Sequence, residues 1–138
     1  HVRGARHSCA AFVEDAFIDD PEPIASAIRI GKPASWQPAK AALQFSAGAI
    51  DKVTDEEILT AYKMITEQEG IFVELASAAA LAGIIKLQNV GKIDEGSIVV
   101  ATMTGHGLKD PDNAVEHANV EVTTVEATLD SVKAAIGI

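Results

Sequence analysis

A threonine followed by Gly-x-Gly stands where a buried strand is expected to end, and this place in the sequence suits chemistry best. Residues 98–103 are an apolar, β-branched run without helical periodicity, typical of a strand buried on both faces of a parallel sheet. In Thr104-Gly105-His106-Gly107 the two glycines permit a tight turn and a close approach of the backbone. Ligands in open α/β sheets bind beyond the carboxyl ends of strands. The pattern indicates a candidate site at Thr104, although a glycine-rich connection without function has the same pattern.

Glu74 and Ser77 form a second candidate group, at the turn between an expected strand (residues 71–73) and a helix rich in small residues (residues 78–88). A hydroxyl and exposed N–H groups at a helix start suit an anion, because this end of a helix carries a partial positive charge. Ser77 fits equally well as a simple N-cap residue of that helix.

Arg29 is the third candidate, and it is expected near the C-terminal end of a helix. The run Asp19-Asp20-Pro21-Glu22 predicts the start of that helix, with an acidic cap and a proline in the first turn, and Gly31 ends it. At this position Arg29 is either a surface charge beside a helix C-terminus or an anion-binding group turned into a cleft.

Further helices that must support these residues carry clear boundary signals. Thr54 with Glu57 forms a capping box, which opens an amphipathic helix that runs to about Glu69 and stops at Gly70. A shorter helix is predicted over residues 38–45, with Phe45 among its apolar contacts, and an amphipathic one over residues 129–136.

Short runs of strand character separate the helices. The order strand–helix–strand–helix predicts the α/β class, with a mainly parallel sheet flanked by helices. The expected strands are residues 10–13, 49–53, 71–73, 98–103 and 120–124.

Composition excludes several classes of function. The 138 residues carry 20 acidic and 11 basic side chains, a net charge of −9 without a basic cluster, which argues against nucleic acid or an anionic membrane as partner. The single cysteine, Cys9, fits a reducing compartment such as the cytoplasm. The sequence has no run of membrane-spanning length. His1 and His7 lack a third ligand nearby, so no metal site is expected.

Six segments together resemble the threonine synthase family, in the family's order and spacing. They cover about Asp19 to Val115, and the combination is specific although no single piece is. The segments are residues 25–36, 46–50, 55–58, 69–74, 76–79 and 102–112, of which the last, Thr-Met-Thr-Gly-His-Gly-Leu-Lys-Asp-Pro-Asp, is the clearest.

The resemblance implies a fold-type II enzyme that depends on pyridoxal 5'-phosphate (PLP) and converts O-phospho-L-homoserine and water to L-threonine and phosphate. Thr104 would face the pyridine nitrogen of PLP, and Gly105 and Gly31 would border the cofactor. The resemblance also places Arg29, Glu74 and Ser77 near the substrate. His106 is more readily a loop residue than a catalytic one.

The sequence departs from the family in ways that bear on activity. Lys32 stands where the family usually has Asn, Leu75 stands where it has Pro, and residues 1–18 match poorly. No lysine here has the context of the family's Schiff-base lysine, which lies upstream together with the phosphate-binding loop, so no catalytic residue is assigned. The chain is expected to be the C-terminal portion of the enzyme and inactive alone. Its expected partners are the missing N-terminal part and, since dimers are common in the family, a second copy.

Two other interpretations remain open at this point. A threonine or serine dehydratase has the same fold and releases ammonia instead of phosphate. A non-catalytic α/β interaction module would be monodisperse and fold cooperatively, whereas a fragment would expose the apolar face that its missing part covers.

Overall fold

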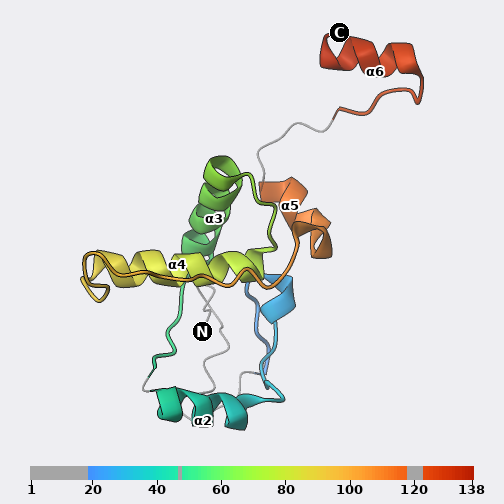
Figure 1. Ribbon diagram of the computed structural model, residues 1–138. Helices are drawn as coiled ribbons and strands as arrows, with labels where there is room; N and C mark the ends of the chain where they lie inside the picture. Colours follow the sequence, from blue (N-terminus) through green and yellow to red (C-terminus); the bar gives the residue numbers. More distant parts are fainter. Residues whose placement is uncertain (1–18, 47, 118–122) are drawn as a thin grey trace.

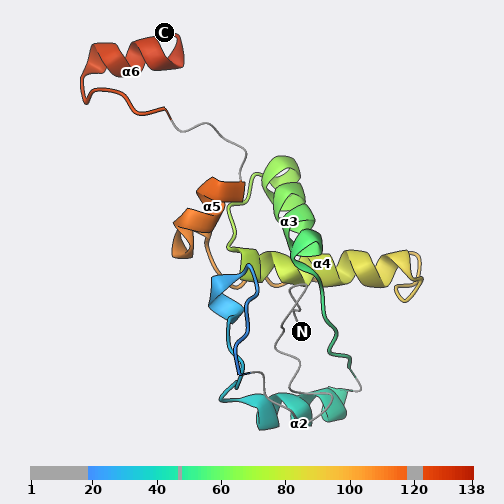
Figure 2. The same cartoon turned by 180° about the vertical axis from the view of Figure 1, so that it is seen from behind.

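The computed structural model of the chain describes residues 19–46, 48–117 and 123–138. Figure 1 shows the helical elements of these residues, seen from behind in Figure 2. In chain order they are η1 (Ser26–Ile28), α2 (Trp36–Ser46), α3 (Asp55–Met64), η2 (Ile65–Glu69), α4 (Leu75–Asn89), η3 (Gly107–Lys109), α5 (Pro111–His117) and α6 (Leu129–Ile136).

The core lies where α3 packs across α4 (Figure 1). The face of α3 that the periodicity predicts is buried, and Ile58, Tyr62 and the following Ile65 are each at most 5% exposed. From α4 the small side chains of Ala78 and Ala82 meet this face, so the two helices can approach closely. This contact fixes the N-terminal turn of α4, which carries Ser77.

Both predicted ends of the α3 helix are confirmed. The N–H of Glu57 donates to Thr54 Oγ1 over 3.2 Å, and the N–H of Thr54 donates to Glu57 Oε2 over 2.6 Å, which completes the capping box. The helix continues through the π-helical turn η2 and stops at Gly70, whose φ of 65° is left-handed.

The start of α4 differs from the prediction. Glu74, with extended backbone angles, is the N-cap residue, and the helix begins at Leu75. Ser77 therefore lies inside the first turn, where its N–H donates to the carbonyl of Glu74 over 3.0 Å. The interpretation of Ser77 as an N-cap residue is wrong, because its hydroxyl bonds to a distant loop instead of its own helix.

The helix predicted from Asp19 up to Gly31 is also wrong, since only the turn η1 forms there. Pro23 accounts for the difference. A proline disfavours helical angles in the residue before it, so Glu22 resists the helical region. The short helix expected at residues 38–45 is present as α2, but Phe45 is 96% exposed and does not make the expected packing contact.

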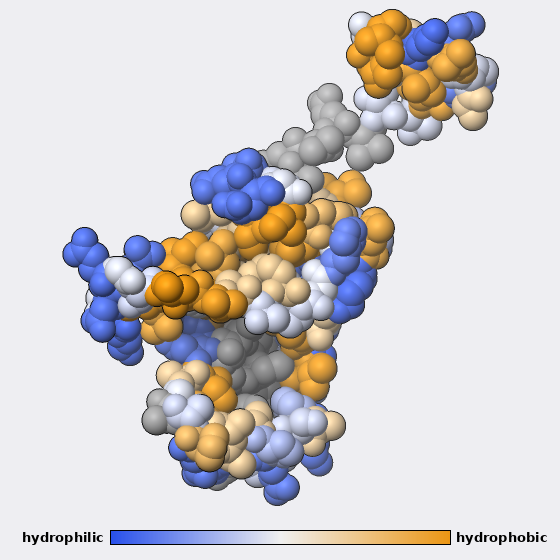
Figure 3. All heavy atoms as spheres, in the orientation of Figure 1, coloured by the Kyte–Doolittle hydropathy of each residue, from blue (hydrophilic) through white to orange (hydrophobic). Residues whose placement is uncertain are grey.

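The parallel sheet stays a prediction. Among the described residues the only bridge between extended segments joins Val73 to His106, in antiparallel sense. Ile98 and Val100, in the run expected to be the central strand, are 95% and 84% exposed, and Figure 3 shows apolar atoms gathered over this segment and α4. A β-branched run of this kind gains little stability as a strand unless neighbouring strands cover its side chains. The strand expected at residues 10–13 and most of that at 120–124 lie outside the described residues.

The amphipathic helix predicted at residues 129–136 is confirmed as α6, which begins at the cap Thr128. It lies apart from the helices that form the core (Figures 1 and 2). Among the helices of the described residues, none has the length and apolar character needed to cross a membrane.

Candidate functional site

Two segments that the sequence singled out lie side by side in the structure. The N–H of Gly107 donates to the carbonyl of Phe72 over 3.1 Å, and the N–H of Glu74 donates to the carbonyl of Gly105 over 3.0 Å. These bonds form the antiparallel bridge between Val73 and His106. The glycine-rich loop is thereby held across the residues that lead into α4, which brings two of the three candidate groups together.

Ser77 joins this loop to α4 through its hydroxyl. The N–H of Gly105 donates to Ser77 Oγ over 2.8 Å, and Ser77 Oγ lies 3.1 Å from Thr104 Oγ1. Ser77 is 1% exposed, whereas Thr104 is exposed. The buried serine therefore holds the exposed threonine in place.

Two arrangements of the hydroxyl protons fit these distances, because either hydroxyl can be the donor. Ser77 has one hydroxyl proton, which can go to Thr104 Oγ1 at 3.1 Å or to the carbonyl of Gly105 at 3.3 Å. That carbonyl already accepts the N–H of Glu74, and the distance to Thr104 is shorter. In the arrangement that places the serine proton on Thr104 Oγ1, the proton of Thr104 is free to be donated outward to a ligand.

Glu74 is a buried carboxylate paired with a lysine of the loop. Lys109 Nζ lies 2.9 Å from Glu74 Oε1, and the side chains of Glu74 and Lys109 are 4% and 58% exposed. The second carboxylate oxygen, Oε2, is buried and has no hydrogen-bond partner among the described residues. Among the described residues, Lys109 is therefore the one cation that compensates the buried negative charge of Glu74.

Gly105 has no side chain because the carboxylate of Glu74 occupies the space. A Cβ at this position would lie 1.9 Å from Glu74 Oε1 and 2.3 Å from Glu74 Cδ. Gly107 meets a similar limit, because its Cβ would lie 2.3 Å from the ring of Phe72. That ring packs edge-on against His106 with ring centroids 5.3 Å apart, which places His106 in a packing contact.

The segment that carries Arg29 and Gly31 is tied to the end of the same loop. Ser26 Oγ donates to Asp110 Oδ2 over 2.5 Å, and Asn113 Nδ2 donates to the carbonyl of Ile24 over 3.2 Å. The bond from Ser26, followed by that from Asn113, lowers the pKa of Asp110 below its usual 3.8. Arg29 itself is exposed, and its guanidinium donates to the carbonyl of Pro23 over 3.2 Å.

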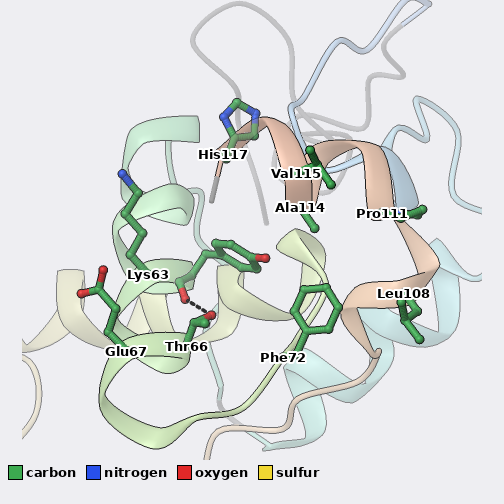
Figure 4. Close-up of a pocket in the computed structure, with 10 residues that line it drawn as sticks. Lys63, Thr66, Glu67, Phe72, Leu108, Pro111, Ala114, Val115 and His117 are labelled. Carbon is green, nitrogen blue, oxygen red and sulfur yellow. Dashed lines mark hydrogen bonds between the residues drawn. The ribbon is translucent and has the colours of Figure 1, made fainter. Parts of the chain in front are cut away.

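An apolar hollow is lined in part by the ring of Phe72 (Figure 4). It measures about 400 Å³ and opens between α3 and α5, with Lys63 and Glu67 on the α3 side and His117 at the end of α5. The rings and aliphatic groups that line it supply few polar atoms. It therefore suits packing better than the recognition of a charged amino acid.

Sequence reasoning missed Lys109 and Asp110 as parts of the site. Both stand in a polar turn after the glycines, and such a turn alone predicts only a loop. Their partners are 35 residues away for Lys109 and 84 residues away for Asp110. No periodicity or local spacing signals a pair of that separation.

Comparison with known proteins identifies the family. The family described as "Pyridoxal-phosphate dependent enzyme" matches residues 2–105, more than half of the chain. Curated relatives are named threonine synthase, and the chain spans about a third of their length. That of Bacillus sp. (strain ULM1) is 48% identical over 124 residues, 90% of this chain and 35% of the relative. That of Mycobacterium leprae (strain TN) is 54% identical over 99 residues, which cover 72% of this chain and 28% of the relative. That of Methanocaldococcus jannaschii is 46% identical over 114 residues, which cover 83% of this chain and 28% of the relative.

These matches agree with the resemblance read from the sequence. The family has the expected fold type II and the expected cofactor, PLP. The match includes all three candidate groups, at Arg29, Glu74–Ser77 and Thr104. The chain therefore belongs to the family of pyridoxal-phosphate dependent enzymes, and within it the chain is similar to threonine synthases.

Proposed function

We propose that the chain is the C-terminal portion of an enzyme of threonine synthase type, which forms L-threonine and phosphate from O-phospho-L-homoserine and water. Curated relatives that bear this name match the chain over 28–37% of their own length. The observation that carries the proposal is the contact between Ser77 and Thr104, because it joins two motifs of the resemblance at one exposed hydroxyl.

The residues present fit one end of PLP. A pyridine nitrogen without a proton needs a hydrogen-bond donor, and Thr104 has an exposed hydroxyl whose oxygen is held by Ser77. The nearby carboxylate of Glu74 is buried and bound by Lys109, whereas the hydroxyl of Thr104 is exposed to a ligand. The group that this chain offers to the pyridine nitrogen is therefore a neutral hydroxyl donor.

In this proposal Thr104 donates to the ring nitrogen, and Ser77 orients the threonine by donating to its oxygen. When bound, PLP supplies an electron-withdrawing ring that stabilises negative charge on the amino-acid substrate, and a neutral donor moderates that pull. Gly105 keeps the backbone close to the cofactor, and Gly31 borders it. Ser77 acts behind Thr104, as its burial favours, and not in direct contact with the substrate.

Arg29 is the residue of this chain best suited to the substrate's phosphate or carboxylate. It is exposed, and the bond between Ser26 and Asp110 holds its segment against the loop that carries Thr104. A guanidinium matches the geometry of either anion. Glu74, the other residue expected at the substrate, remains near the site through its bond to Gly105.

The remainder of the enzyme is the main partner in this proposal. The lysine and the phosphate-binding loop that hold PLP in the family are not matched by any residue of this chain, so we expect the 138 residues alone to be inactive. We expect the complete enzyme to be cytoplasmic and to form homodimers.

The test is a comparison of products from the native polypeptide that carries these residues. The enzyme, purified with its cofactor, is given O-phospho-L-homoserine in one assay and L-threonine or L-serine in another. We expect phosphate release in the first assay and no comparable ammonia release in the second. Ammonia release without phosphate release would show a dehydratase, and neither product would favour a non-catalytic module.

A further inference from the structure

We propose that Glu74 and Lys109 form a latch that holds the glycine-rich loop on the N-terminal turn of α4, and that Lys109 is thereby a positioning residue for Thr104. The existence of the latch does not depend on the reaction, whereas its effect on Thr104 rests on the function proposed above. The elements that it joins are α4, through its cap Glu74, and η3, which contains Lys109.

The latch is a charge pair with one partner inside the protein. Glu74 is 4% exposed, and its only charged contact among the described residues is the ammonium of Lys109 at 2.9 Å. Removing one partner of such a pair leaves a buried charge uncompensated, which is costly. Lys109 approaches from the surface, since 58% of its side chain is exposed, so it can be replaced without a cavity.

The pair lies directly over the backbone next to Thr104. The ammonium of Lys109 is 2.9 Å from the point where a Cβ on residue 105 would lie, and Glu74 Oε1 is 1.9 Å from that point. The backbone of Glu74 also donates to the carbonyl of Gly105. Gly105 therefore lies against the carboxylate of Glu74, and its backbone is hydrogen-bonded to the N–H of Glu74 and to the hydroxyl of Ser77.

The pair is better explained by positioning than by stability. Burying an ion pair returns little net free energy, and Glu74 Oε2, which is buried without a partner among the described residues, adds a desolvation cost. A leucine or methionine pair would fill the same space without that cost. What the charges provide is a single register between η3 and α4, and this register sets the place of Thr104.

A double-mutant cycle tests the latch without using the reaction. In the native polypeptide labelled with 15N-glycine, the amide exchange rates of Gly105 and Gly107 report loop opening, and that of Gly83 within α4 serves as reference. We expect Lys109→Met and Glu74→Gln each to raise exchange at Gly105 and Gly107 about tenfold, and the double variant to raise it no further. Gly83 should be unaffected.

Two further variants separate the latch from general effects of charge removal. Lys109→Arg keeps a cation and should restore slow exchange. Lys86→Met removes a lysine from another ion pair of α4, with Asp51 at 3.4 Å, and should leave Gly105 unchanged. The proposal is overturned if Lys109→Met does not accelerate exchange at Gly105, if the two single effects add, or if Lys109→Arg behaves as Lys109→Met. Failure of the proposed reaction would leave all of these rates as predicted.

Discussion

Ser77 and Thr104 are 27 residues apart in the chain, and their hydroxyl oxygens are 3.1 Å apart in the structure. The serine is buried in the first turn of α4, and the threonine is exposed at the end of the apolar run. Because Ser77 also accepts the N–H of Gly105, one side chain fixes both the backbone and the hydroxyl of the loop. When the serine proton lies on Thr104 Oγ1, this arrangement leaves the threonine proton for a ligand.

The first prediction concerns Ser77→Ala. Its loss leaves the N–H of Gly105 without its acceptor, which costs about 1–3 kcal/mol of unfolding free energy, measured by urea denaturation. Phosphate release by the native enzyme should fall about tenfold, as Thr104 loses the partner that orients it. Ser97→Ala, at an exposed serine, is the matched control and should change neither. Unchanged stability and rate for Ser77→Ala would contradict the claim that Ser77 holds Gly105 and orients Thr104.

The second prediction compares two glycines. Gly105→Ala places a Cβ 1.9 Å from Glu74 Oε1, so the carboxylate must move, and we expect a loss of about 1–3 kcal/mol in unfolding free energy. Gly83→Ala, inside α4, meets no atom within 4 Å and should raise stability by about 0.5–1 kcal/mol. Equal effects at the two positions, measured by the same denaturant titration, would show that Glu74 does not occupy the space over Gly105.

The third prediction concerns pH. The pKa of Asp110 is lowered from 3.8, chiefly by the hydrogen bond from Ser26, so its carboxylate stabilises the folded state above about pH 4. This stabilisation is lost as the pH falls through the lowered pKa. Asp110→Asn should therefore destabilise the protein at pH 7, and the difference from wild type should be smaller at pH 2. A difference of the same size at both pH values would contradict this, and Asp94→Asn is the control.

The fourth prediction concerns the support of the site. Thr54→Ala removes the hydroxyl that accepts the N–H of Glu57 and should cost about 1 kcal/mol in thermal or urea unfolding, whereas Thr54→Ser should cost little. If both variants unfold like wild type, the capping box does not stabilise the packing of α3 on α4.

Local signals predicted the helices well where the chemistry that sets an end is itself local. The capping box at Thr54 and the stop at Gly70 each need partners within four residues, and both are present. The helix expected from Asp19 does not form because Pro23 disfavours helical angles at Glu22, which outweighs the start signal.

The site itself was predicted only in its parts. The resemblance singled out Thr104, Glu74 and Ser77, but their contacts with one another and with Lys109 span 27 to 35 residues. Such pairs depend on how α4 meets the loop, which periodicity does not describe. Ser77 differs from its expected role for the same reason. Local spacing suggested an N-cap residue, whereas its side chain bonds to the distant hydroxyl of Thr104.

The most direct measurement of the central claim is the rate of phosphate release by Thr104→Ser and Thr104→Val in the native enzyme. Serine keeps the hydroxyl, and valine keeps the shape without a proton to donate. We predict that Thr104→Ser retains most of the rate and that Thr104→Val loses about ten- to a hundredfold, as expected for one lost hydrogen bond to a ligand. A Thr104→Val enzyme as fast as wild type would contradict the assignment of Thr104 to the cofactor.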